Sequence, residues 1–132
     1  MGRKEYLIDT NVAIYYFGQL LTKESESFLE DILKTKYSIS VINRMELLGN
    51  KNLEQQEQNA LESFVNSAFV YNLDEEIILE TISIRKKYGI KLPDAIIAAT
   101  CLANNCKLIT NNQKDFDKIE KLKTLQVNLI KF

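Results

Sequence analysis

Four acidic residues stand at the start of helical segments or just after apolar runs typical of strands: Asp9, Glu46, Asp94 and Asp115. Two carboxylates about 4 Å apart repel each other by about 4 kcal/mol at an effective dielectric near 20. Four that converge would therefore take up protons or bind cations. Because the chain has no histidine, the donors would be hard oxygens, which favour Mg²⁺ or Mn²⁺ over zinc or copper. A cation held there could activate water and neutralise a phosphate, which is the chemistry of phosphodiester hydrolysis.

Polar side chains accompany the acids along the chain. Ser40 and Asn43 precede Glu46, and the residues expected to support the acids directly are Asn11, Thr110 and Asn112. Hydroxyl and amide groups beside carboxylates are typical of an oxygen-rich cation site. Taken one at a time, however, three of the acids also fit helix N-caps, and Glu46 fits a solvated helix position.

The two cysteines, Cys101 and Cys106, cannot complete a structural zinc site within a chain that has no histidine. Both lie at apolar stretches, which predicts buried free thiols. Free thiols suit a reducing cytoplasm. The first residues contain no signal-peptide segment and no apolar run approaches the ~20 residues needed to cross a bilayer, so we expect a cytoplasmic protein that does not enter the membrane.

Strands must alternate with helices to position these acids. Apolar runs predict strands over 6–8, 37–41, 68–73, 107–110 and 126–132. Helical patterns cover 10–17, 22–36, the segment around Glu46, 53–66, 74–88 and 93–103. The last of these is apolar on nearly every side, which predicts an interior helix packed closely on the sheet.

This alternation predicts an α/β protein, a three-layer α/β/α sandwich around a central, mainly parallel sheet. In such sheets the functional crevice lies beyond the carboxyl ends of the strands, which is where the acids stand. A length of 132 residues fits a single domain over 1–132. The net charge of −1 argues against a protein that coats nucleic acid nonspecifically.

Four segments of the chain resemble the PIN-domain family, and in particular the VapC-type toxins of bacterial toxin–antitoxin pairs. They are DTN at 9–11, SVINRME at 40–46, LPDAIIAAT at 92–100 and LITNNQKDF at 108–116. They occur in the family's order and at family-like spacing from residue 6 to about residue 117. The third segment is fairly specific and the first is weak alone, but the ordered set is strong.

The resemblance implies a Mg²⁺- or Mn²⁺-dependent endoribonuclease that cleaves structured RNA such as tRNA or rRNA. Such toxins are usually homodimers and are neutralised by a cognate antitoxin. Asp9, Glu46 and Asp94 match the family's metal-binding acids, and Asp115 matches a less constant fourth. Asn112 departs from the family, because many relatives have aspartate there, which leaves open whether one cation binds or two.

Basic residues close to the acids in sequence are candidates for contacts with RNA phosphates: Arg44, Lys91 and Lys114. For each of them a solvated position on the surface is an equally good interpretation. The RNA target, the cleaved bond and the antitoxin are not determined by the sequence.

Other proteins that place aspartates at strand ends fit less well. A haloacid-dehalogenase-like phosphatase needs a second aspartate where Asn11 stands, and a receiver domain needs adjacent acids where Ile8 precedes Asp9. Nucleotide-binding folds need a glycine-rich loop, and the four glycines are scattered. The alternative that stays open is a catalytically inactive PIN-like module that binds RNA or protein, although pure binding does not require four acids near a polyanion.

Overall fold

A parallel sheet forms the centre of the molecule in the computed structural model, which describes residues 5–131. Its five strands are β1 (Glu5–Ile8), β2 (Ser38–Ser40), β3 (Phe69–Tyr71), β4 (Cys106–Ile109) and β5 (Thr124–Leu125). Every pairing is parallel, and the order across the sheet is β3-β2-β1-β4-β5. Residues 1–4 and Phe132, at the two ends of the predicted domain, lie outside the described residues.

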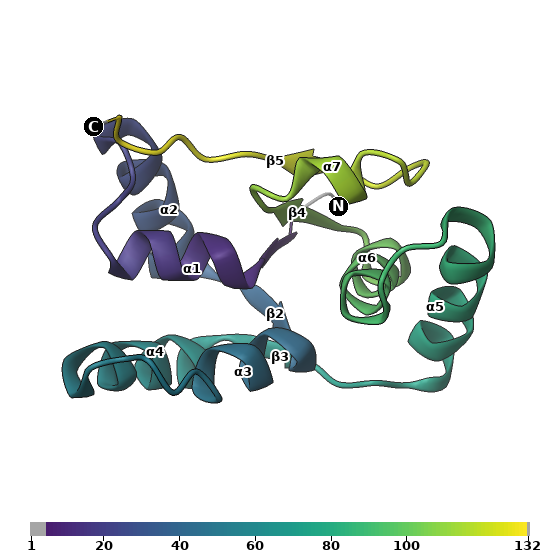
Figure 1. Ribbon diagram of the computed structural model, residues 1–132, viewed down its shortest axis with the longest axis horizontal. Coiled ribbons are helices and arrows are strands. Elements are labelled where there is room, and N and C mark those ends of the chain that lie inside the picture. Colours follow the sequence, from purple (N-terminus) through teal and green to yellow (C-terminus); the bar gives the residue numbers. More distant parts are fainter. Residues whose placement is uncertain (1–4, 132) are drawn as a thin grey trace.

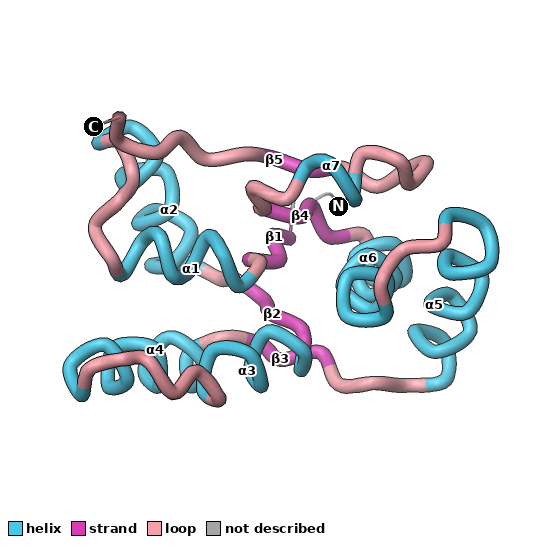
Figure 2. The backbone as a smooth tube through the Cα atoms, viewed as in Figure 1, coloured by secondary structure: helices cyan, strands magenta, loops and turns pink. Residues whose placement is uncertain are grey.

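Helices cover both faces of this sheet. They are α1 (Thr10–Phe17), α2 (Lys23–Thr35), α3 (Val41–Leu48), α4 (Gln55–Ser67), α5 (Glu75–Tyr88), α6 (Leu92–Asn104) and α7 (Gln113–Phe116). Figure 1 shows α1, α2 and α4 on one side of the strands and α5 and α6 on the other. In Figure 2 the strands run through the middle of the molecule between these two groups of helices. The predicted three-layer α/β/α sandwich is confirmed.

Alternation along the strands divides the core into two layers. Leu7 and Leu108 are fully buried against α5 and α6, whereas their neighbours Ile8 and Ile109 are buried against α1 to α4. Successive side chains of a strand point to opposite faces, so a strand in the middle of a three-layer protein must be apolar on both. This explains why the strands read as continuous apolar runs.

Helix α6 packs on the sheet through an inner face that contains small residues. Ala95, Ala98 and Ala99 are fully buried, and alanine lets the backbone of a helix approach the strands. The helix begins with a proline in its first turn and ends at Asn105, which adopts a left-handed conformation with φ of 54°. The predicted interior helix is confirmed.

The predicted fifth strand over 126–132 is wrong, because the strand lies earlier, at Thr124–Leu125. After it the chain leaves the sheet: Leu129 forms an isolated antiparallel bridge with Leu21, and the side chain of Asn111 holds Val127. The Val127 amide donates to Oδ1 of Asn111 at 3.0 Å, and Nδ2 of Asn111 donates to the Val127 carbonyl at 3.1 Å. Val127 is therefore buried although its backbone pairs with a side chain and not with another strand. The apolar pattern of the sequence is the same in both cases, so it does not distinguish them.

The remaining expectations about burial hold within residues 5–131. Cys101 and Cys106 are both free and buried, as predicted. No helix in this range combines the length and the apolar content needed to span a bilayer.

Candidate active site

The order of the strands makes the carboxyl ends of β1 and β4 the expected place for a binding site. From this pair the chain continues outward in one direction through β2 and β3 and in the other through β5. Loops that leave neighbouring strands in opposite directions open a gap at their carboxyl ends, where α/β proteins bind ligands. Asp9 follows β1 directly and Thr110 follows β4 directly, so both stand at this gap.

Asp9 is the most constrained of the four acids. It is 5% exposed and forms the N-cap of α1, where Oδ1 accepts from the Thr10 amide at 2.9 Å. Oδ1 also accepts from Nδ2 of Asn43 at 3.2 Å, and Oδ2 accepts from Oγ1 of Thr110 at 2.7 Å and from Nδ2 of Asn11 at 3.4 Å. Four donors from three segments therefore hold one carboxylate in a single orientation.

Glu46 lies beside Asp9 through a chain of hydrogen bonds. It is an exposed residue of α3, and its Oε1 accepts from Oγ1 of Thr10 at 2.6 Å. The same Thr10 hydroxyl accepts from Nδ2 of Asn43 at 3.1 Å. The helix begins immediately after β2 because Ser40 caps it and Asn43 completes the capping box, which also ends the predicted strand 37–41 one residue early.

Asp94 and Asp115 form a second pair from the other helical layer. Asp94 lies in the first turn of α6 and Asp115 in the short helix α7. Nδ2 of Asn112 stands between them, 3.4 Å from an Oδ2 of each. The loop that carries Asn112 is held to the first pair, because its amide donates to Oγ1 of Thr110 at 3.0 Å.

The two pairs are close enough to affect each other's protonation. Burial, followed by the charges of Asp9, Asp115 and Glu46, raises the pKa of Asp94 to about 6. Burial also raises the pKa of Asp9, against the hydrogen bonds from Thr110 and Thr10 that lower it. A carboxyl group whose neighbours are also carboxylates resists ionisation. This electrostatic strain is what a bound cation would relieve.

The side chains fit a hard divalent cation in their chemistry. The side chains that meet at the candidate site are carboxylates, hydroxyls and amides, and carboxylate oxygens are ligands that Mg²⁺ and Mn²⁺ prefer. Within residues 5–131, however, no three acidic or thiol side chains stand together as a ready-made ligand set. Hydrogen bonds link the acids as two pairs, Asp9 with Glu46 through Thr10 and Asp94 with Asp115 through Asn112. A cation shared by both pairs would have to draw them closer.

The predicted supporting residues all contact the acids, as described above for Asn11, Thr110 and Asn112. The three basic residues proposed for phosphate contacts, Arg44, Lys91 and Lys114, are exposed. Lys91 lies near enough to Asp94 to lower its pKa, against the larger effects that raise it. In the described part of the chain none of the three is held in an ion pair, which leaves their charges available to a polyanion.

Sequence reasoning named Asn43 only as a polar neighbour of Glu46 and gave Thr10 no role of its own, although both link the first pair of acids. Asn43 is completely buried, and a buried amide three residues before an acid on the same helix was the available signal. The pattern showed the polar residue but not its partner, because Asp9 lies 34 positions away in the chain.

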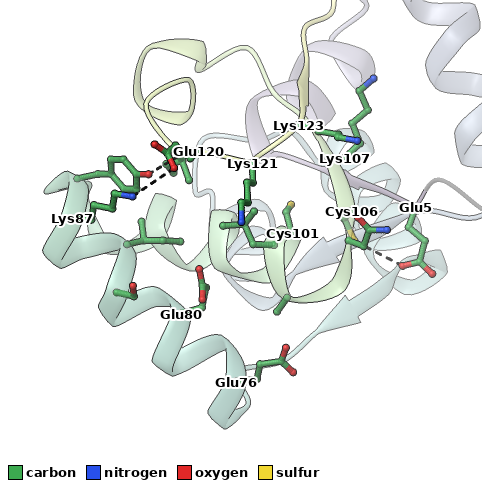
Figure 3. A pocket seen from close by; sticks show the side chains of 17 residues that line it. Glu5, Glu76, Glu80, Lys87, Cys101, Cys106, Lys107, Glu120, Lys121 and Lys123 are labelled. Atoms are coloured by element: carbon green, nitrogen blue, oxygen red, sulfur yellow. Dashed lines mark hydrogen bonds and ion pairs between the residues drawn. The ribbon is translucent and has the colours of Figure 1, made fainter. Parts of the chain in front are cut away.

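A large cavity lies at the opposite edge of the sheet from the acids. It has a volume of about 880 Å³ and is bordered by Glu5 and Cys106, the first residues of β1 and β4. Figure 3 shows these two residues on one side of the cavity and Glu76, Glu80 and Lys87 of α5 on another. Both lysines and glutamates line it, and it contains none of the four candidate acids.

Comparisons with known proteins identify a family and similar solved structures. A protein-family model described as the PIN domain matches residues 6–122. Curated protein sequences include no significant match to the chain.

Several solved structures are similar over nearly the whole chain. A toxin–antitoxin complex from Klebsiella pneumoniae contains a chain with 29% identity and a TM-score of 0.72, with 89% of this chain and 94% of that chain covered. The structure of VapBC-1 from nontypeable Haemophilus influenzae contains a chain with 28% identity and a TM-score of 0.73, with 92% of this chain and 97% of that chain covered. The DNA-bound VapBC from Salmonella typhimurium has a TM-score of 0.79 at 20% identity, with 94% and 98% covered, which supports the fold alone.

Proposed function

This chain belongs to the PIN-domain family, and we propose that it is the toxin of a VapBC-type toxin–antitoxin pair, an endoribonuclease that uses Mg²⁺ or Mn²⁺ to hydrolyse structured RNA such as tRNA or rRNA. The family and the similarity to toxin–antitoxin complexes support a nuclease toxin in general terms. The metal, the RNA substrate and the roles of individual residues are the proposal's own content.

The observation that carries the proposal is the electrostatic coupling of two pairs of acids at one sheet edge. Burial, followed by the charges of Asp9, Asp115 and Glu46, raises the pKa of Asp94 to about 6. A carboxylate that only caps a helix does not require three other acids nearby. Their mutual repulsion lowers the stability of the folded chain unless a cation binds between them. Divalent cations bound by these acids would supply that charge beside the scissile phosphate and lower the pKa of a water molecule.

Some side chains of the proposed site are held rigidly and others are free to move. Asp9 is fixed by four hydrogen bonds, so it would define the position of the site. Glu46 is exposed, and within residues 5–131 its side chain is held by the Thr10 hydroxyl alone, so it can rotate to reach a ligand. Asn112, placed between Asp94 and Asp115, reduces their mutual repulsion without adding charge. Exposed Arg44, Lys91 and Lys114 would contact flanking phosphates.

The proposed partners follow from the same proposal. The structures with about 28–29% identity are toxin–antitoxin complexes, so we expect a cognate antitoxin that neutralises this chain, and a homodimeric toxin. We also expect the protein to act in the cytoplasm, where its RNA substrates would be found and where free thiols such as those of its two buried cysteines stay reduced.

The alternative function is a PIN-like module that binds RNA or protein without cutting it. The two readings differ in what the acids do: a binding module would gain from losing negative charge near RNA, whereas a nuclease would be inactivated. The complete set of Asp9, Glu46, Asp94 and Asp115, with its polar supports in contact, favours the nuclease.

The test is cleavage of a tRNA and rRNA pool by the purified chain. We expect cleavage with Mg²⁺ or Mn²⁺, none in excess chelator, and a loss of more than about 100-fold in Asp94→Asn, since even outer partners of a metal site typically contribute 10–100-fold. Asp117→Asn is the matched control, because Asp117 is an exposed acid two residues from Asp115. Cleavage that persists in chelator or in Asp94→Asn would contradict the metal mechanism, and tighter RNA binding by Asp94→Asn without cleavage by either chain would support the binding module.

A further inference from the structure

Helix α5 exposes a stripe of apolar side chains on its outer face. Figure 1 shows α5 at the periphery, with α6 between it and the sheet. The helix buries Ile77 and Ile84 toward the core, whereas Leu79 and Ile82 are 59% and 48% exposed. At 3.6 residues per turn these two lie on the side opposite the buried residues, so nothing within residues 5–131 covers them.

Charged residues of opposite sign stand at the two ends of this stripe. Glu75, Leu79, Ile82 and Lys86 are spaced four, three and four residues apart, which is the spacing of a seam between two packed helices. All four are exposed. Glu75 precedes Leu79 by as many residues as Lys86 follows Ile82. Two copies of the stripe laid side by side in opposite directions would therefore place an acid opposite a base at each end and apolar side chains opposite each other in the middle.

We propose that the outer stripe of α5, Glu75-Leu79-Ile82-Lys86, is the surface through which two copies of this chain pair, with the two α5 helices antiparallel. In that arrangement Leu79 of one copy packs on Ile82 of the other, and Glu75 meets Lys86 at both ends. A two-fold contact uses the same patch on both partners, and a stripe that is complementary to its own reverse meets that requirement. A parallel pairing would instead bring Glu75 beside Glu75 and Lys86 beside Lys86.

Three other charged side chains of α5 border the cavity, and Nε of Arg85 donates to the Ile90 carbonyl at 3.3 Å. Figure 3 shows Glu76, Glu80 and Lys87 on the side of the helix that borders the cavity. Lys87 is already engaged there, because its Nζ lies 3.7 Å from Glu120 and 5.3 Å from the centre of the Tyr88 ring. The outward stripe is therefore the part of α5 that combines apolar area with unengaged charge at both ends.

This proposal specifies the contact for the homodimer proposed above, and it does not depend on nuclease activity. One pair of helices covers less than the roughly 800 Å² per partner of a typical stable complex. We therefore expect a reversible dimer whose population rises with protein concentration. The readout is molecular mass, so the absence of RNA cleavage would leave the dimer proposal standing, and a monomer would leave the nuclease proposal standing.

The experiment is sedimentation of the purified chain over a concentration series. We expect Leu79→Glu to be monomeric throughout, and Glu75→Lys and Lys86→Glu each to weaken the dimer roughly tenfold, since two exposed ion pairs become two repulsions. Glu76→Lys, with the same charge change in the same first turn but on the cavity side, is the matched control and should dimerise as the parent chain does. Circular dichroism checks that each variant is folded.

Mixing the two charge variants gives the sharpest outcome. Glu75→Lys carries only basic ends and Lys86→Glu only acidic ends, so an equimolar mixture should form a mixed dimer more readily than either variant alone. The combined Glu75→Lys, Lys86→Glu chain should also recover dimerisation. A parent chain that stays monomeric, a dimer that survives Leu79→Glu, or a mixture no more associated than its components would each overturn the proposal.

Discussion

Nδ2 of Asn43 donates to Oδ1 of Asp9 at 3.2 Å, which joins the first turn of α3 to the end of β1. The same amide donates to Oγ1 of Thr10 at 3.1 Å, and Oδ1 of Asn43 accepts from the Ser40 amide at 2.8 Å. One buried side chain thus caps a helix and orients a candidate metal ligand. Stability and site geometry depend on the same residue.

We predict that Asn43→Ala lowers both stability and RNA cleavage. Removing the side chain leaves the buried Ser40 amide unsatisfied and frees Asp9 and Thr10, which should reduce the free energy of unfolding by about 2–4 kcal/mol. Denaturant unfolding measures the first effect, and the rate of RNA cleavage under conditions where the variant is folded measures the second.

Two further variants separate the roles of Asn43. Asn43→Asp keeps an acceptor for the Ser40 amide but replaces the donor facing Asp9 with a carboxylate, so it should lose cleavage. Ser40→Ala removes the N-cap side chain, which accepts from the Ile42 amide, and should lower stability by about 1 kcal/mol with cleavage retained. If Asn43→Asp cleaves as well as the parent chain, the contact with Asp9 does not position the site.

Asp94 should make the cation-free protein less stable as the pH rises. Its folded pKa is raised from 3.8 to about 6, so its contribution is fully present below about pH 4 and is lost as the pH rises through about 6. Asparagine resembles the protonated acid and removes this dependence. We therefore predict that Asp94→Asn is the more stable chain at pH 7, by about 1–2 kcal/mol after allowance for the partial exposure of the side chain.

The measurement is denaturant unfolding of both chains from pH 4 to pH 7 in chelator. The advantage of Asp94→Asn should grow across this range, because only the parent chain has the carboxyl group that ionises at that position. Addition of Mg²⁺ at pH 7 should then stabilise the parent chain more than the variant, since a ligand that binds the folded state stabilises it. A stability difference that is constant with pH would show that folding does not raise the pKa of Asp94.

The exposed lysines near the acids should contribute to RNA binding through charge alone. In an Asp94→Asn background that cannot cleave, we predict that Lys91→Ala and Lys114→Ala each weaken binding several-fold. Each should also reduce the slope of log K against log salt concentration by roughly 0.7–0.9, the value for one phosphate contact. Lys34→Ala, an exposed lysine in the last turn of α2, should leave the slope unchanged, and an equal effect there would mean that the two lysines make no specific contact.

Local patterns in the sequence determined the elements and the candidate residues. Apolar runs identified four of the strands, the apolar segment before Asn105 identified α6, and oxygen donors after strands identified the acids. These features depend on the preferences of neighbouring residues and on burial of each element's own face. Where a side chain substitutes for a strand partner, as Asn111 does for Val127, the local pattern misled and the fifth strand was misplaced.

Only the tertiary structure decided which acids become partners. Asp9 reaches Asn43 and Thr110 because β1 lies between β2 and β4, and the order of strands is not encoded in the periodicity of any one of them. Packing of α6 against α7 likewise set the Asp94–Asp115 pair, with Asn112 between them. Contacts between segments so distant in sequence form only when the helices and the sheet pack together. Residue types and spacing therefore could not predict that the four acids are linked as two pairs and not as one cluster.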